Sequence, residues 1–555
     1  MYNFRELIKK PFLALFIITL IITGYLLYKQ IYIGVPYYDV FVYLNNALIF
    51  AGIPVGNVSV IYLSPLMPFL TSLIFRAGYI SANALFILDA LIFVLGVLGL
   101  YLLFRQRFNQ IQSFSGSLIF ISFPLIFTWA ASGGIDIPGV SLSIWTIYLL
   151  VMGVKKDSKY LYLVVPILMV AFMARYTSVI LVFPIFLYLL INKDFTENFK
   201  KIFIGLLASL ALFIPFLVYF YSKLGNINPL INLVTSTIMG AGGAVNDLGY
   251  NPDKLYFLYN LLNYVNVGPL QGVYRQVQNP SQGFPSVIAY ILIVVVLIGL
   301  GIYLYRMLKI KMENSRGGKR NKTVWHVLVL ILLLVAGVWS FFSSSYIICE
   351  ILFLAVFYVA YLLLKGTGEN LELDFLFLSW FSAFFIFHSI IPLKVDRYFI
   401  TMSPALAYFL ILGLSTVFEK YKSRITFKRF KVEHLYLLVG LVLIVSTLAV
   451  HVGHTPRHGY GYQIQVASDW LMEYDPDYQN KMIFSDYDPA LSWSLKKEVK
   501  FAVPRIYVGP DSFARFLMDN KADYYIDAYT DPKWSIPGYH IIRNMSGIAI
   551  YQRDS

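Results

Sequence analysis

The stretch YYDVFVYLNNALIFAGIPVGNVSVIYLSPLMPFLTSLIFRAGY, residues 37–79, lies between the first strongly hydrophobic run of the chain and the second. Its acid, Asp39, follows the apolar run Pro11 to Tyr28, which is long enough to cross a bilayer as a helix. A carboxylate there is expected where water meets lipid headgroups. Two helical segments follow, Val40 to Ala51 and Ser64 to Tyr79, separated by a turn rich in glycine and proline. A connection with helices of its own indicates a structured surface.

The composition excludes an ordinary soluble domain. Hydrophobic residues make up 58% of the chain, charged residues 13%, and the mean hydropathy is +0.68. The net charge of +14 would suggest nucleic-acid binding in a soluble protein, but the basic residues fall in short blocks between apolar runs. The only cysteine, Cys349, lies in a predicted span, so no intrachain disulfide can form. The N-terminal run is too long for a signal-peptide core and is expected to remain as a membrane helix.

The apolar runs predict a polytopic α-helical membrane protein with about thirteen transmembrane helices. They are expected at residues 11–28, 81–104, 115–132, 138–154, 160–174, 177–192, 201–221, 286–307, 324–342, 346–364, 373–391, 398–418 and 434–450.

The segment Ser64 to Tyr79 decides the topology, because counting it as a span would invert every later loop. If it stays in the outer interface, 25 of the 44 lysines and arginines fall on one side, as the positive-inside bias of membrane proteins requires. Pro65 and Pro68 in its first turns also favour an interfacial or re-entrant helix. The N-terminus is then cytoplasmic and the C-terminus extracytoplasmic.

Residues 1–450 are thus expected to form a transmembrane domain, with outer loops at 29–80 and 222–285. The second loop carries glycines at 240, 242 and 243 and aromatic helical patches, and we interpret it as a cap at the interface. From residue 451 the composition becomes globular, and short strand and helix patterns predict a small extracytoplasmic α/β domain over 451–555.

Two acids stand at the outer ends of predicted helices. They are Asp39 and Asp136, the latter in the turn before Pro138. Carboxylates at such a boundary can accept a proton from an incoming hydroxyl or hold a divalent cation, so both are candidate catalytic residues. The alternative for Asp136 is that it only caps the following helix.

A second candidate group is the outer-face sequence Lys394-Val395-Asp396-Arg397-Tyr398. Arg397 offers a planar fork to phosphate oxygens, and Lys394 lies three residues before it, so the pair suits a lipid-linked phosphate at headgroup height. The alternative is a salt bridge between Arg397 and Asp396, with the long side chains reaching the headgroups.

The order of these features resembles GT-C-type glycosyltransferases, in particular the group of protein O-mannosyltransferases and aminoarabinose transferases. The resemblance rests on Asp39 in the first outer loop, Asp136-Ile137-Pro138 in the second, and Arg397-Tyr398 with Pro404 in a late outer loop. It covers the layout of residues 11–420. It implies a GT-C-like fold with an outer soluble tail, and transfer of a sugar from a polyprenyl-phosphate donor.

The sequence also departs from that group. Many members place an acid or histidine before the Pro-Pro of the second loop helix, whereas this chain has Tyr62-Leu63-Ser64-Pro65, which puts a divalent-metal site in doubt. No Trp-Trp-Asp motif of the oligosaccharyltransferase kind is present, which argues against transfer of a preassembled glycan.

Several further polar residues fall in or beside predicted spans. Asp89 and Arg175 could form a buried pair, and His388 and Glu350 lie near outer helix ends. We expect Arg175 and His388, with Tyr62 and Tyr398, as candidate pocket residues. The histidines at 451, 454 and 458 have a spacing that can bind metal, but Pro456 should interrupt their helix.

Two functions remain open on the sequence. The first is an inverting glycosyltransferase that moves one sugar from a polyprenyl-phosphate donor to a protein, lipid or glycan acceptor on the extracytoplasmic face. The second is a lipid or solute transporter. Transporters often carry paired repeats with helices broken at mid-membrane, which this sequence lacks, and its polar groups gather at one face.

Overall fold

A computed structural model describes residues 10–53, 60–192, 195–238, 251–268, 279–315, 320–343, 345–368, 370–422, 431–453, 460–528, 533–545 and 547–554. In these ranges ten helices are long and apolar enough to cross a membrane. They are α2 (Pro11–Ile33), α5 (Ala82–Phe104), α8 (Asp136–Lys155), α11 (Phe195–Leu224), α16 (Val287–Ser315), α17 (Arg320–Ser343), α18 (Tyr346–Leu364), α19 (Leu371–Ile390), η5 with α20 (Asp396–Lys420) and α22 (Val432–Gly453). The predicted polytopic helical fold is confirmed, and the protein is an integral, multi-pass membrane protein.

Three of the thirteen expected spans are shorter or broken. The run at 115–132 divides into α6 (Gln110–Ser122) and α7 (Pro124–Trp129), because Pro124 has no amide hydrogen to continue the helix. The runs at 160–174 and 177–192 become α9 (Leu161–Ala174) and a 3-10 turn, η3 (Tyr176–Leu181), that leads into α10 (Val182–Ile191). Arg175 is extended between them and interrupts the helix.

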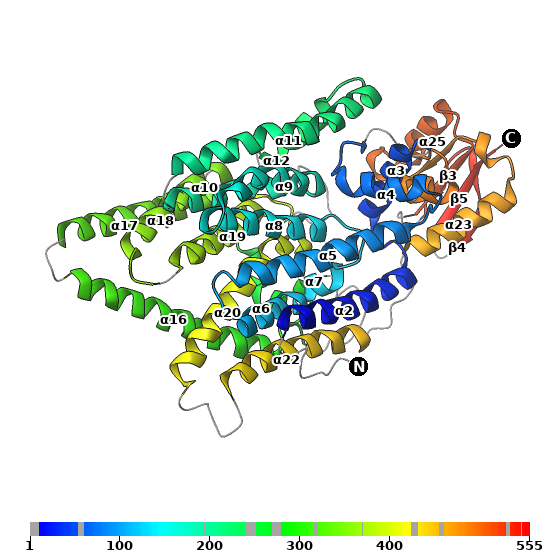
Figure 1. Cartoon of the computed structure of the whole chain (residues 1–555). Coiled ribbons are helices and arrows are strands. Elements are labelled where there is room, and N and C mark those ends of the chain that lie inside the picture. Colours follow the sequence, from blue (N-terminus) through cyan, green and yellow to red (C-terminus); the bar gives the residue numbers. More distant parts are fainter. Residues whose placement is uncertain are drawn as a thin grey trace.

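The outer loop at residues 37–79 folds as two short helices, α3 (Tyr38–Ala51) and α4 (Leu66–Arg76). The 11 residues of α4 extend about 16 Å, roughly half the hydrocarbon thickness, so this helix is too short to cross the bilayer. Both helices lie between the membrane helices and the C-terminal sheet (Figure 1). The C-terminal region therefore packs on the two helices of the first outer loop.

Labelling at three positions tests this topology. In a Cys349→Ser background, Tyr32→Cys at the end of α2 and Tyr79→Cys after α4 should react with a membrane-impermeant maleimide from the same face. Asn109→Cys, beyond α5, should react only from the other face, because one span separates it from Tyr79. Labelling of Tyr32→Cys and Tyr79→Cys from opposite faces of sealed vesicles would mean that residues 64–79 cross the membrane.

The C-terminal region is an α/β sandwich around a five-stranded sheet. The strands are β1 (Ile483–Ser485), β2 (Lys500–Phe501), β3 (Tyr524–Asp527), β4 (Tyr539–Met545) and β5 (Ile548–Arg553), in the order β2-β1-β3-β5-β4. Strands β2, β1 and β3 are parallel, and β5 runs antiparallel to β3 and β4. Helices α23 (Tyr460–Tyr474) and α24 (Asp488–Leu495) cover one face, and α25 (Pro510–Asp519) covers the other. The strand patterns of the sequence lie at 482–485, 499–503, 523–527 and 548–552, which correspond to β1, β2, β3 and β5, and β4 was not predicted.

One hydrophobic core joins this sheet to the first outer loop. Buried residues of α3 such as Leu44 and Leu48 lie in the same cluster as Leu491 of α24 and Ile526 of β3. Phe75 of α4 also stacks on Trp493, with ring centroids 5.9 Å apart. Burial of this apolar surface fixes the sheet against α3, which carries Asp39.

The second outer loop contains α12 (Asn228–Ile238), α13 (Tyr256–Tyr259), α14 (Leu261–Val265) and a 3-10 turn, η4 (Pro280–Gln282). Of its described parts, α13, α14 and η4 pack on the loop before α20, as the site below shows, whereas Leu230 of α12 packs with residues of α3 and α11. The glycines at 240–243 lie outside the described residues.

Candidate active site

The candidate site centres on Arg397, at the start of η5. Its Nη2 donates to Asp39 Oδ2 at 2.7 Å, and its Nε lies 3.9 Å from Asp136 Oδ2. These residues come from three distant segments, and the fold brings together both candidate catalytic acids and the candidate phosphate-binding arginine.

The two acids differ sharply in exposure. The Asp39 side chain is 40% exposed and that of Asp136 is 4% exposed. Asp136 is the first residue of α8 rather than its cap, since the capping position is Ile135 and no side chain caps the helix. Its Oδ1 pairs instead with Arg175. The capping interpretation is therefore wrong, and Asp136 is a buried partner of an arginine.

Aromatic rings hold both guanidinium groups. The Arg397 guanidinium lies 4.6 Å from the ring centroid of Tyr37 and 5.9 Å from that of Trp129, and Arg175 lies 5.2 Å from that of Tyr398. Such cation–π contacts fix the plane of an arginine without using its hydrogen-bond donors. Burial raises the pKa of the Tyr37 hydroxyl, so this ring stays neutral.

Asp89 holds the turn that precedes α8, and it does not pair with Arg175. Asp89 Oδ2 accepts a hydrogen bond from the Gly133 amide at 2.9 Å. A Cβ at Gly134 would lie 2.5 Å from the Tyr37 hydroxyl, so a larger residue there would have to displace the Tyr37 ring that contacts Arg397. The Asp89–Arg175 pair that the sequence left possible does not form, because Arg175 pairs with Asp136.

Lys394 does not reach this cluster. Its buried Nζ donates to the carbonyls of His388 at 3.0 Å and Ser389 at 2.8 Å, which belong to the last turn of α19. A lysine there stabilises carbonyl groups that the helix leaves without partners. Burial lowers the pKa of Lys394 to about 8. In this structure Lys394 holds the loop and does not face Asp39.

Asp396 also turns away from Arg397, so the proposed salt bridge between neighbours is wrong. Its Oδ1 accepts from the hydroxyls of Tyr256 at 2.6 Å and Tyr264 at 2.9 Å, and its Oδ2 accepts from the Ser281 amide at 2.8 Å. These donors belong to the second outer loop, which is thereby tied to the segment that presents Arg397.

The candidate pocket residues have mixed positions. His388 is buried against the Tyr398 ring, with centroids 5.0 Å apart, so both support Arg175. Tyr62 contributes its backbone carbonyl, which accepts from the Tyr176 hydroxyl. Glu350 is buried in α18.

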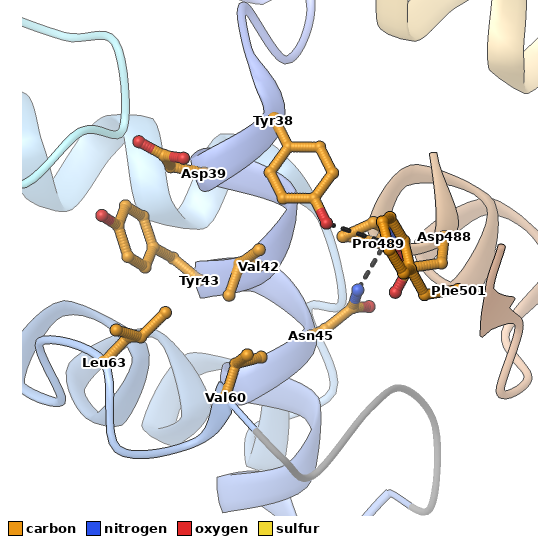
Figure 2. Close-up of a pocket in the computed structure, with 10 residues that line it drawn as sticks. All are labelled: Tyr38, Asp39, Val42, Tyr43, Asn45, Val60, Leu63, Asp488, Pro489 and Phe501. Carbon is orange, nitrogen blue, oxygen red and sulfur yellow. Dashed lines mark hydrogen bonds between the residues drawn. The ribbon is translucent and has the colours of Figure 1, made fainter. Parts of the chain in front are cut away.

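A cavity of about 320 Å³ opens beside Asp39, between α3 and the C-terminal region (Figure 2). It is lined by Tyr38, Asp39, Val42, Tyr43, Asn45, Val60, Leu63, Asp488, Pro489 and Phe501. The sequence did not point to Asp488 or Asn45, because nothing in it shows that residue 488 returns to α3.

The acids at this site do not fit a resident divalent cation. Asp39 and Asp136 both face arginines, and a metal ion would have to displace these guanidinium groups. Within the described ranges, no group of three His, Cys, Asp or Glu side chains has a metal-binding arrangement. His451 lies beside Thr128, with His451 Nε2 3.1 Å from the threonine hydroxyl, and residues 454 and 458 lie outside the described residues.

The chain is similar to a known protein family and to solved structures. Residues 63–219 match the family model of dolichyl-phosphate-mannose-protein mannosyltransferases. The structure resembles that of ArnT from Cupriavidus metallidurans bound to undecaprenyl phosphate, with 11% identity, a TM-score of 0.58 and coverage of 97% of both chains. The protein has the GT-C fold. The resemblance drawn from the sequence is confirmed.

A second structure supports the same fold. The archaeal oligosaccharyltransferase AglB from Archaeoglobus fulgidus, in complex with an inhibitory peptide and a dolichol-phosphate, is 14% identical with a TM-score of 0.53. The match covers 94% of this chain and 70% of AglB. No curated protein sequence matches the chain. The GT-C fold thus extends over nearly the whole chain, while the family match begins at residue 63, after α3 and Asp39, and covers α4 and the helices that follow as far as residue 219.

Proposed function

We propose that this GT-C protein is a membrane glycosyltransferase that moves a single sugar from a polyprenyl-phosphate donor to an acceptor on the extracytoplasmic face, with inversion at the sugar carbon. The observation that carries the proposal is the cluster of Arg397 with Asp39 and Asp136, which lies at the outer ends of membrane helices and beside a cavity. A donor anchored by its lipid tail arrives from the membrane, and a polar acceptor arrives from water.

Arg397 is suited to hold the donor phosphate. Its fork geometry matches phosphate oxygens, and among the described residues its Nε has no hydrogen-bond partner. A bound phosphate would compete with Asp39 for this guanidinium. Donor binding therefore frees the Asp39 carboxylate at the moment when the acceptor must be activated.

Asp39 then acts as general base. It takes the proton of the acceptor hydroxyl while the hydroxyl oxygen forms a bond to the anomeric carbon of the sugar, and the bond from this carbon to the phosphate oxygen breaks. The products are a glycoside, a polyprenyl phosphate and a protonated Asp39, which returns its proton to water. Arg397 stabilises the charge on the departing phosphate.

Asp136 is a positioning residue in this scheme. It is buried, and it balances the charges of Arg175 and Arg397 from beneath. An arginine held by a carboxylate and an aromatic ring keeps its orientation when its hydrogen bond to Asp39 breaks. Preorganised binding of a phosphate requires this fixed orientation.

A transfer assay tests the function. The purified protein in lipid nanodiscs is given polyprenyl-phosphate-linked hexoses and pentoses, of which mannose is tested first. We expect it to release one polyprenyl phosphate for each sugar transferred. The released lipid phosphate is measured by mass spectrometry together with the glycosylated product. In sealed proteoliposomes, movement of intact donor from one leaflet to the other without cleavage would instead support the transporter.

The proposed orientation places the N-terminus in the cytoplasm and residues 451–555 outside, because this puts most basic loops on the inner side. The acceptor can be a protein, a lipid or a glycan. The side chains that line the cavity beside Asp39 restrict which chemical groups this acceptor can carry.

A further inference from the structure

The cavity beside Asp39 has walls from two parts of the chain. Figure 2 shows Tyr38, Val42 and Asn45 of α3 along one side and Asp488 and Pro489, at the start of α24, facing them. Asp39 lies at the same cavity, so a molecule bound there would meet the proposed base. Among the described residues that line it, none is a lysine, arginine or histidine.

Two buried side chains in the lining of this cavity, Asp488 and Asn45, carry hydrogen-bond acceptors. Asp488 is 4% exposed, and its Oδ1 accepts from the Tyr38 hydroxyl at 3.2 Å. Asn45 is also 4% exposed; its Nδ2 donates to the Pro489 carbonyl at 2.8 Å, while its Oδ1 has no hydrogen-bond partner among the described residues. A buried carbonyl oxygen without a donor is unfavourable, and a ligand that donates hydrogen bonds would remove this cost.

A structural role for Asp488 alone does not account for these features. Asp488 is the first residue of α24, where any acid interacts favourably with the helix dipole. An exposed position would serve that purpose, as Asp511 does in the first turn of α25. Burial against α3 instead raises the pKa of Asp488 to about 7. The buried position of Asp488, together with the buried Oδ1 of Asn45 that has no hydrogen-bond partner among the described residues, points to a ligand.

The rim of the cavity adds a flat apolar surface. Phe501 of β2 lines the cavity and is 49% exposed. An exposed aromatic ring beside buried hydrogen-bond acceptors is typical of sites for molecules that have one apolar face and several hydroxyl groups.

We propose that this cavity is the acceptor subsite, that it binds a hydroxyl-rich or amine-bearing group such as a sugar ring through Asp488 and Asn45, and that it excludes anionic acceptors. The inference rests on the proposed function and deepens it. The carboxylate of Asp488 and the amide oxygen of Asn45 attract hydroxyl and ammonium groups, whereas a carboxylate or phosphate placed against Asp488 would be repelled, because Arg397 is paired with Asp39 and not with Asp488.

Binding of three matched probes tests this inference without turnover. The probes are octyl glucoside, its 2-amino derivative and octyl glucuronide, measured by calorimetry with the full chain in nanodiscs at pH 8, where Asp488 is ionised. We expect the wild type to bind the neutral and amino glycosides at least tenfold more tightly than the glucuronide. In Asp488→Asn this preference should fall about tenfold.

Asp511→Asn is the matched control, because it removes an acid from a helix first turn far from the cavity lining. It should leave all three affinities unchanged. Equal preferences in wild type and Asp488→Asn, or an equal loss in Asp511→Asn, would overturn the acceptor subsite. An intact fold of each variant is checked by its thermal unfolding.

Kinetics separate this inference from the proposed function. If the wild type transfers sugar and Asp488→Asn raises KM for a glycoside acceptor but not for the polyprenyl-phosphate sugar, both stand. A change in donor KM alone would assign the cavity to the donor sugar and overturn the acceptor subsite. If no donor is consumed while the probes bind as expected, the proposed function falls and the binding site remains.

Discussion

Asp39→Asn should lower the turnover of sugar transfer by a factor of about 10² or more, since the amide keeps the shape of the side chain but cannot accept the acceptor's proton. The fold should be little affected, because the Asp39 side chain is 40% exposed and Arg397 keeps the carboxylate of Asp136 beside it. The measurement is kcat in purified protein with a polyprenyl-phosphate sugar and a matched acceptor, alongside the midpoint of thermal unfolding.

The effect of Asp39→Asn is to be compared with that of Asp136→Asn. Removing the charge of this buried carboxylate leaves Arg175 as a buried cation without its partner, which costs about 3–5 kcal/mol of stability. We therefore expect Asp136→Asn to lower the thermal midpoint, and Asp39→Asn to leave it in place. If Asp39→Asn keeps near-normal turnover while a folded Asp136→Asn protein is inactive, the base is Asp136 and our assignment is wrong.

The sequence predicted the fold class and the three charged residues of the cluster, because each signal is local. Long apolar runs predict spans, and the acids and Arg397 stand next to them in loops. The pairing of these residues could not be predicted. Arg175 was matched with Asp89, yet the Gly133 amide takes Asp89 and leaves Arg175 to Asp136.

Charged residues that are neighbours in the sequence do not share one site where the chain reverses direction. Lys394, Asp396 and Arg397 lie within four positions, but the extended residue Val395 precedes a 3-10 turn, and the side chains around it go to three different partners. Lys394 holds the end of α19, Asp396 holds the second outer loop, and Arg397 alone faces the site. Charge spacing in a loop does not show which side chains share a face.

Asp488 shows what long-range packing adds. It is 449 positions from Asp39 in the chain, and the hydrophobic cluster shared by α3, α24 and the sheet brings both to one cavity. No pattern in the sequence around residue 488 indicates a site, since an acid before a proline at a helix start is common in proteins. The site therefore depends on the C-terminal region as well as on the membrane helices.

Arg397→Ala should reduce kcat/KM for the polyprenyl-phosphate donor by about 10²–10³, the loss expected when a preorganised donor to the departing oxyanion is removed. Arg397→Lys keeps the positive charge but loses the planar fork and the ring contact with Tyr37, so it should cost less, about 10- to 100-fold. The measurement is donor kinetics at saturating acceptor, with direct binding of polyprenyl phosphate to each variant.

Lys394→Ala serves as the control for this series, because its ammonium group faces carbonyls of α19 and not the cluster. It should lower the thermal midpoint and leave donor affinity unchanged. Loss of Arg397 also removes the partner of Asp39, so a purely structural effect would appear equally in donor and acceptor KM, whereas a phosphate contact appears in the donor alone. Unchanged donor affinity in both Arg397 variants, with weaker donor binding in Lys394→Ala, would move the phosphate site from Arg397 to the end of α19.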